Sequence, residues 1–137
     1  MPTTQVTKDI NAPAEKLYQI MKEREKNPIW NITVNEVNII SDQKASYKTT
    51  VGDLNLMLTE DIKNEKIAYD VEGNPLMTKM IYSFKDKGDK SEATLAGEFP
   101  NADQEKILIT AADVLLESLK KYAEYLEEGG DPSSYKK

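Results

Sequence analysis

The chain has 137 residues, of which 39% are hydrophobic and 31% charged, and its net charge is −6. This length suits a single domain with one hydrophobic core. Cysteine and histidine are absent from the sequence, which excludes disulfides, thiolate and imidazole metal ligands, and a Ser-His-Asp catalytic triad. The negative charge argues against nucleic acid or an anionic membrane as a partner, because both attract clusters of Lys and Arg.

Neither a membrane-spanning stretch nor a signal peptide is expected. No apolar run approaches the roughly 20 residues that a membrane-spanning helix needs. Segment 3–10 carries charged residues and lacks the apolar h-region of a secretory signal, so a cytoplasmic location is the expectation. No metal or cofactor is expected either. The acidic residues do not follow an EF-hand spacing, and Gly129-Gly130 comes after a helix, whereas a phosphate-binding loop precedes one.

The first elements expected along the chain are a short strand and a short helix. Gln5–Ile10 favours a strand, and Pro13 with Glu15 is typical of the first turn of a helix. Apolar residues then recur on one helical face: Ala14, Leu17, Ile20 and Met21. The helix is expected to break up through charged segment 22–27, which adds at most one more turn. Pro28 is expected to end the helix, because a residue before proline is pushed out of the α region.

Six further strands are expected after this helix, because apolar residues alternate within six runs that turn-forming residues separate. The runs are 34–41, 44–52, 54–62, 66–72, 78–85 and 90–99. Connections this short favour hairpins, so the six strands are predicted to form an antiparallel meander. The first strand can close one edge of that sheet.

Segment Asn101–Glu128 is expected to form one long helix. At 100° per residue, a single sector holds the apolar and small side chains Leu108, Ala111, Ala112, Leu115, Leu119, Tyr122, Ala123 and Leu126. Asn101 is the predicted N-cap, with Gln104 at capping-box spacing, and Gly129-Gly130 is the predicted stop. More than half of the circumference is apolar or small, so the helix needs a concave partner surface.

These elements predict an α+β domain at residues 1–128, followed by a flexible tail at residues 129–137. The expected order is a strand, a short helical region, a six-stranded antiparallel meander and a long C-terminal helix packed in the curved sheet.

The start of this pattern resembles a known superfamily. The run Ile10-Asn11-Ala12-Pro13-Ala14-Glu15-Lys16-Leu17-Tyr18 is similar to the "I-x-A-P-x-E-x-V-W/Y" opening of the START-like (SRPBCC) superfamily, which includes polyketide cyclases, pollen allergens and carbon monoxide dehydrogenase G-type proteins. The step Pro28-x-Trp30 before Val34 and Val37, and the closing helix after Phe99-Pro100, extend the similarity over residues 3–127. The resemblance implies a helix-grip fold with a cavity between the sheet and the last helix. Members of the superfamily bind lipids, sterols, polyketides or plant hormones. The resemblance transfers no catalytic residue, because the superfamily shares none.

Period-two alternation predicts which side chains face such a cavity. The candidate ligand-binding residues are Trp30, Tyr47, Leu56, Leu58, Glu60, Tyr69, Met80, Tyr82, Leu95, Ala111, Leu115 and Ser118. The three tyrosines are interpreted either as core residues whose hydroxyls reach water or backbone, or as groups that orient a ligand. Trp30 is expected near the cavity mouth, where it either packs under the loops or gates entry.

Glu60 is the one weak catalytic candidate, because it is a carboxylate on an otherwise apolar face of its strand. If the Glu60 carboxyl were enclosed in a cavity, burial would raise its pKa and the group would serve as an acid or base. At the rim, it would instead pair with a lysine such as Lys8. Asp61 is expected on the outer face.

Three hypotheses for the function follow. The first is binding or transport of a small hydrophobic molecule, lipid-like or polyketide-like, between the sheet and the last helix. The second is an enzyme of the cyclase or dehydratase kind that uses Glu60 and tyrosines for proton transfer. The third is a protein-interaction module without a ligand, with a homodimer as one form of it.

Overall fold

The computed structural model describes residues 2–50 and 52–137, in which a strand and a short helical region precede six strands and a long helix. The elements are β1 (Thr3–Ile10), α1 (Ala14–Lys22), a 3-10 turn (Arg24–Lys26), α2 (Asn27–Trp30), β2 (Val34–Ile39), β3 (Lys44–Thr49), β4 (Gly52–Ile62), β5 (Lys66–Glu72), β6 (Lys79–Asp86), β7 (Ser91–Glu98), a 3-10 turn (Ala102–Gln104), α3 (Glu105–Glu127) and a 3-10 turn (Pro132–Ser134).

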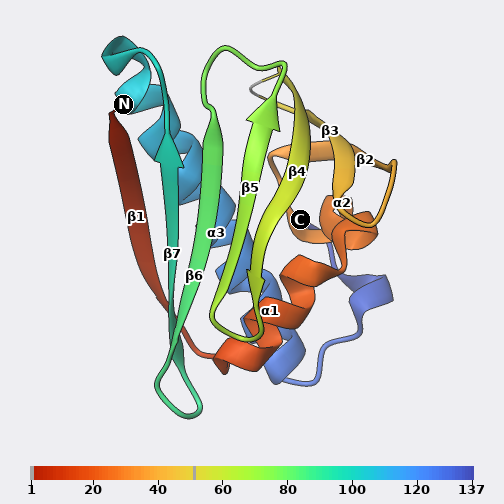
Figure 1. Cartoon of the computed structure of the whole chain (residues 1–137). Coiled ribbons are helices and arrows are strands. Elements are labelled where there is room, and N and C mark those ends of the chain that lie inside the picture. The colour runs from red at the N-terminus through yellow and green to blue at the C-terminus, as the bar shows by residue number, and fades with distance from the viewer. Residues whose placement is uncertain (1, 51) are drawn as a thin grey trace.

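The strands form one antiparallel sheet in the order β1-β7-β6-β5-β4-β3-β2. Strands β2 to β7 follow one another as a meander, and β1 pairs with β7, with Val6 opposite Leu95. The predicted α+β architecture is therefore confirmed, including the closure of one edge by the first strand. Figure 1 shows α3 running behind the curved sheet, with α1 and α2 beside it at one end.

Helix α3 buries one face against the sheet. Its buried residues are Leu108, Ala112, Leu115, Leu116, Ser118, Leu119, Tyr122 and Ala123. The Asn101 side chain accepts a hydrogen bond from the Asp103 N–H at 2.9 Å, as predicted for the N-cap. After the helix, Gly129 takes a φ of +90°, a conformation that glycine adopts without steric cost. The long helix and its end before the two glycines were thus predicted correctly. Its start differs from the prediction, because residues 102–104 form a 3-10 turn and α3 begins at Glu105.

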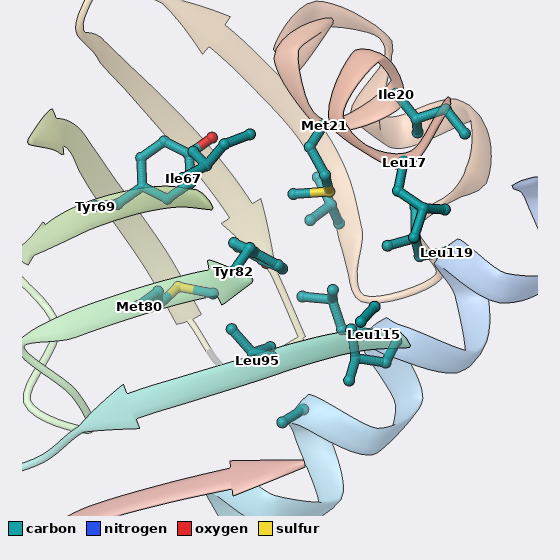
Figure 2. Packing of buried hydrophobic residues seen from close by; sticks show 14 of the residues in the cluster. Leu17, Ile20, Met21, Ile67, Tyr69, Met80, Tyr82, Leu95, Leu115 and Leu119 are labelled. Carbon is teal, nitrogen blue, oxygen red and sulfur yellow. The ribbon is translucent and has the colours of Figure 1, made fainter. Parts of the chain in front are cut away.

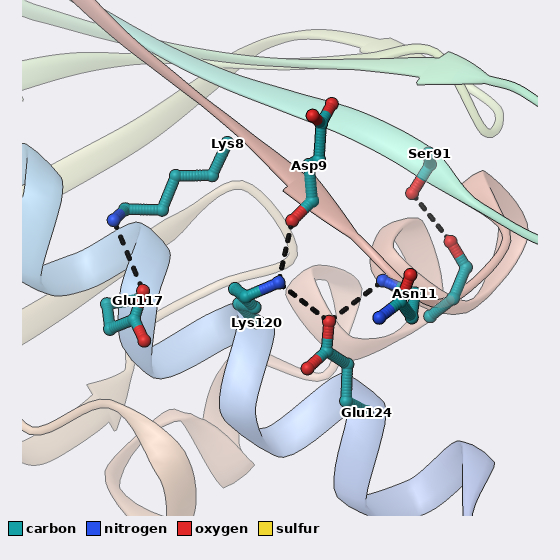
Figure 3. Close-up of polar contacts among 8 residues, drawn as sticks. Lys8, Asp9, Asn11, Ser91, Glu117, Lys120 and Glu124 are labelled. Atoms are coloured by element: carbon teal, nitrogen blue, oxygen red, sulfur yellow. Dashed lines mark hydrogen bonds and ion pairs between the residues drawn. The ribbon is translucent and has the colours of Figure 1, made fainter.

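Polar contacts fasten α3 to β1 and to the turn before α1 (Figure 3). Lys8 on β1 lies 3.0 Å from Asp113 and 3.2 Å from Glu117. Lys120 donates to the Asp9 carbonyl at 2.9 Å. These contacts set the position of α3 along the edge of the sheet.

Helix α1 ends at Lys22, within the segment where it was expected to break up, and the next residue, Glu23, has left the α region (φ −82°, ψ 68°). The structure corrects the expectation that the residue before Pro28 would be non-helical. Asn27 instead takes helical angles (φ −51°, ψ −42°), and Pro28 lies in the first turn of α2, where its missing N–H has no intrahelical partner to lose. Burial of Trp30 (1% exposed) holds this short turn against the local preference of the residue before proline.

A bulge in β4 corrects the predicted alternation. Leu58 pairs with Tyr69, but Glu60 pairs with the next residue, Ala68, so β4 holds one extra residue. After an extra residue in a strand, each following side chain points to the opposite face of the sheet from the one that alternation predicts. Asp61, opposite inward-facing Ile67, therefore takes the place on the inner face that was expected for Glu60.

The last residues contact the body of the molecule. The Tyr135 ring lies 4.9 Å from the rings of both Tyr122 and Tyr125. The Lys137 ammonium donates to the carbonyls of Asn31 and Val34 at 3.1 and 2.8 Å. The flexibility expected for residues 129–137 stays a prediction, and these contacts argue against it.

Candidate ligand cavity

A cavity of about 80 Å³ lies between the concave face of the sheet and the first half of α3. The residues that line it are Thr4, Met21, Asn27, Asn31, Thr33, Val34, Tyr47, Thr49, Thr50, Leu54, Leu56, Tyr69, Met77, Met80, Tyr82, Leu95, Ala96, Gly97, Leu108, Ala111, Ala112 and Leu115. Figure 2 shows Met80, Tyr82 and Leu95 on neighbouring strands, with Leu115 on the helix across from them. The sheet thus supplies the floor of the cavity and α3 its roof.

The end of the cavity nearest solvent is marked by threonines. Thr4, Thr33 and Thr49 are half-buried and Thr50 is exposed. The remaining walls are mainly buried apolar side chains. About 80 Å³ holds several waters, because one water needs roughly 10–15 Å³ on this kind of measure, but it is far below the roughly 300 Å³ of the smallest drug-sized sites. A guest of about one ring would need the walls to move, because a cavity that holds benzene measures about 150 Å³. Met21, Met77 and Met80 are walls that can adapt in this way.

No Asp, Glu, Lys or Arg occurs among the described residues that line the cavity. A charged guest would therefore lose its hydration without gaining a charged partner, which costs several kcal/mol. A neutral guest avoids that cost.

Two tyrosines bring hydroxyls to the cavity floor. Tyr69 and Tyr82 are 2% and 3% exposed, and their rings lie edge to face with centroids 6.3 Å apart. Burial raises the pKa of Tyr69 and of Tyr82 well above the ordinary value for a phenol, so both hydroxyls keep their protons.

A buried arginine lies behind this floor. Arg24 is 8% exposed and donates from Nε to the Tyr47 hydroxyl at 2.8 Å. Its Nη1 and Nη2 donate at 3.0 Å to the carbonyls of Gln43 and Leu56. The guanidinium carbon also lies 4.9 Å from the centre of the Tyr69 ring. Within the described part of the chain, no carboxylate forms an ion pair with Arg24, so its charge is balanced by carbonyl dipoles and aromatic faces.

The structure brings together many of the predicted site residues. Those that line the cavity are Tyr47, Leu56, Tyr69, Met80, Tyr82, Leu95, Ala111 and Leu115. Their role in binding a ligand stays a prediction.

The other predicted site residues lie outside the lining. Glu60 points away after the bulge and pairs with Lys66 at 2.8 Å, not with Lys8. Leu58 is only partly buried beside the core. Ser118 Oγ accepts a hydrogen bond from the Ile32 N–H at 3.3 Å, which fixes the loop after α2.

Trp30 lies away from the mouth where it was expected. It lines a separate groove of about 560 Å³ between α1, α2 and the end of α3, and its ring is stacked with Tyr122 at 6.3 Å.

Sequence reasoning missed the polar part of the lining next to α2. Asn31 donates to the Asn27 side chain at 3.1 Å and accepts from the Thr33 N–H at 3.0 Å, and all three residues line the cavity. The two asparagines are four positions apart, so their contact could have been predicted if a helical turn had been expected at residues 27–30. Arg24 stands out as the one arginine in the sequence, but no periodic pattern of the residues around it predicts that it is buried.

Asp61 was expected to be solvated on the outer face, but it binds α1. It accepts hydrogen bonds from the Tyr18 hydroxyl and the Lys22 ammonium. The hydrogen bond to Asp61, with a contribution from burial, raises the pKa of Tyr18 to about 12. Neither residue lines the cavity.

A curved antiparallel sheet that holds a long C-terminal helix over an apolar cavity defines the START-like helix-grip fold, and this chain has that fold. Its structure is similar to a START superfamily protein from Mycobacterium smegmatis, with a TM-score of 0.81 and 17% sequence identity over 90% of this chain and 98% of the other. It is also similar to the Zhui aromatase/cyclase from Streptomyces sp. R1128 (TM-score 0.77, 14% identity, 95% and 99% of the two chains). A third similar structure is the Aha1 dimer from Colwellia psychrerythraea (TM-score 0.75, 18% identity, 90% and 97%). No protein-family model and no curated protein matches the sequence.

None of the helices in the described part of the chain is long and apolar enough to cross a membrane. In residues 2–50 and 52–137, no group of three or more acidic side chains is arranged to hold a metal ion.

Proposed function

We propose that the protein binds a small, neutral and mostly apolar molecule in the cavity between the sheet and α3. The observation that carries the proposal is the uncharged and mainly apolar lining of the space between the sheet and α3. Interiors are normally filled to a density of about 0.74, so space of this size under a helix that offers Ala111 and Ala112 favours a guest.

The cyclase or dehydratase hypothesis receives less support. It depended on Glu60, which lies outside the cavity, and no carboxylate occurs among the described lining residues. The similarity to an aromatase/cyclase is at 14% identity, which concerns the fold. Tyrosine hydroxyls with raised pKa values are poor general bases at neutral pH.

The proposal is tested by native mass spectrometry of protein purified without detergent, followed by extraction of small molecules that copurify. Protein that has been stripped by refolding is then titrated with ethylbenzene, a neutral single-ring hydrocarbon, and followed by NMR on the amides of Ala111 and Ala112. Saturable binding at one site is expected. Failure to bind ethylbenzene, with no copurified apolar molecule, would leave the interaction-module hypothesis as the better one.

Two further expectations belong to this proposal. A cytoplasmic location is checked by imaging a fluorescent fusion in the source cells. The homodimer is a second possibility, because a similar structure is described as a dimer. Light scattering after size exclusion gives the mass in solution, and 15.5 kDa would exclude a stable dimer.

A further inference from the structure

The hydroxyl groups of Tyr69 and Tyr82 lack a hydrogen-bond partner within the described residues. Buried hydroxyls normally find one, because an unpaired buried polar group costs about 1–3 kcal/mol. Within residues 2–50 and 52–137, the side-chain polar atoms that are both unpaired and fully occluded are Trp30 Nε1 and Asn64 Oδ1. Neither tyrosine oxygen is among them, so both reach open space. Because the two residues are only 2% and 3% exposed and both line the cavity, that space is the cavity.

The Tyr47 hydroxyl is constrained by Arg24. Arg24 Nε–H can only donate, so the Tyr47 oxygen is the acceptor in their 2.8 Å hydrogen bond. The hydroxyl proton of Tyr47 is then directed away from Arg24, and it meets no acceptor among the described residues. The cationic partner also polarises the phenol and strengthens it as a donor.

Three phenol donors from β3, β5 and β6 thus border one uncharged space. We infer, on the basis of the proposed function, that the cavity selects a neutral ligand with a hydrogen-bond acceptor oxygen, such as a ketone or aldehyde, and that Tyr47, Tyr69 and Tyr82 are the donors that recognise it. A carbonyl oxygen satisfies an unpaired O–H without bringing charge into the cavity. A carboxylate would also accept these bonds, but the nearby cation of Arg24 does not line the cavity and already donates to Tyr47 and two carbonyls. The carboxylate would therefore lose its hydration without gaining a direct ion pair.

The test compares three single-ring probes of similar size: ethylbenzene, acetophenone and benzoate. Dissociation constants are measured by NMR titration for the wild type and for Tyr47→Phe, Tyr69→Phe and Tyr82→Phe. Each variant loses one oxygen atom and keeps the ring. Tyr135→Phe is the matched control, because its ring packs against Tyr122 and Tyr125 and does not line the cavity.

At least one of the three cavity variants is expected to weaken acetophenone binding about tenfold while changing ethylbenzene binding by less than about twofold. Tyr135→Phe is expected to change neither constant. Thermal unfolding of each variant identifies any that has lost its fold, and the remaining variants decide the result. Benzoate is expected to bind more weakly than acetophenone.

The inference is overturned if no folded cavity variant separates the ketone from the hydrocarbon, or if benzoate binds more tightly than acetophenone. In either case ethylbenzene still binds, and the proposed function stands. If none of the three probes binds, the proposed function itself fails, so the two failures are distinguishable.

Discussion

Glu124 of α3 accepts a hydrogen bond from the backbone N–H of Asn11 at 2.9 Å, across 113 positions of the chain (Figure 3). The same carboxylate oxygen accepts from the Lys120 ammonium at 2.9 Å. Asn11 lies between β1 and α1, where the Ser91 hydroxyl also donates to the Ala12 carbonyl at 2.7 Å. The Glu124 side chain of α3 therefore binds the turn between β1 and α1.

The first prediction concerns the pH dependence of this contact. Burial alone would raise the pKa of Glu124, but the donors Asn11 N–H and Lys120 outweigh it and hold the pKa below its ordinary value of 4.5. A carboxyl with a lowered pKa in the folded state adds stability above its unfolded-state pKa and loses it as pH falls through its folded pKa. Glu124→Gln is therefore expected to lower the free energy of unfolding at pH 7, by a margin that shrinks below pH 4.5.

Urea denaturation from pH 7 down to pH 3 measures this margin. Glu128→Gln is the control, because Glu128 is exposed just after the same helix. A margin for Glu124→Gln that stays constant over the whole range would contradict the assignment of the effect to its charge.

The second prediction concerns Arg24. Arg24→Met leaves the carbonyls of Gln43 and Leu56 and the Tyr47 hydroxyl without their donor. We expect a loss of about 2–4 kcal/mol in the free energy of unfolding, since hydrogen bonds from charged groups and unpaired buried acceptors are each worth about 1–3 kcal/mol. Lys26→Met removes a cation from an exposed pair with Glu23, where solvent screens the charges, and should have a much smaller effect. Equal effects in chemical denaturation would show that Arg24 is not held as described.

The third prediction concerns the volume of the cavity. Ala112 is 9% exposed and lines the cavity from α3, so Ala112→Leu places three more carbons in it. Affinity for ethylbenzene should fall by about tenfold or more, while stability should change by less than about 1.5 kcal/mol because the added carbons enter free space. The exposed Ala102→Leu, in the turn before α3, should leave affinity unchanged. Retained affinity in a folded Ala112→Leu protein would place the ligand elsewhere.

The fourth prediction concerns the C-terminal tail. The Tyr135 N–H donates to the Pro132 carbonyl, and its ring packs between those of Tyr122 and Tyr125. Tyr135→Ala should raise the hydrogen-exchange rates of the Ser133 and Ser134 amides severalfold, with Lys136→Ala as the control. Full-rate exchange of these amides in the wild type would instead support the flexible tail that composition predicts.

The fold could be predicted because its signals are local and repeated. Alternating apolar residues located the six strands of the meander to within about two residues at most ends. The broad apolar face of segment 101–128 required a concave partner, and α3 has one. The fold prediction was wrong where a tertiary contact outweighed a local sequence preference. Pro28 was expected to stop a helix, yet the buried Trp30 holds the turn that contains it.

The candidate site could be predicted only in part, because the residues that line a cavity depend on how the strands pair and on where along each strand the cavity lies. Tyr69, Tyr82 and Leu95 were placed by alternation within single strands, and they line the cavity. Glu60 was placed on the wrong face, because one extra residue in β4 switches the side of the sheet to which the side chains after Leu58 point. No local sequence pattern predicted this bulge.

By itself, the sequence determined the class of fold and the mainly apolar character of the concave face, since both follow from the periodic placement of apolar side chains. Only the tertiary structure decided which groups meet across that face. Arg24 reaches Tyr47 over 23 positions, and Glu124 reaches Asn11 over 113. Such pairs depend on the curvature of the sheet and the seating of α3, which result from packing the whole core and are not properties of any one segment.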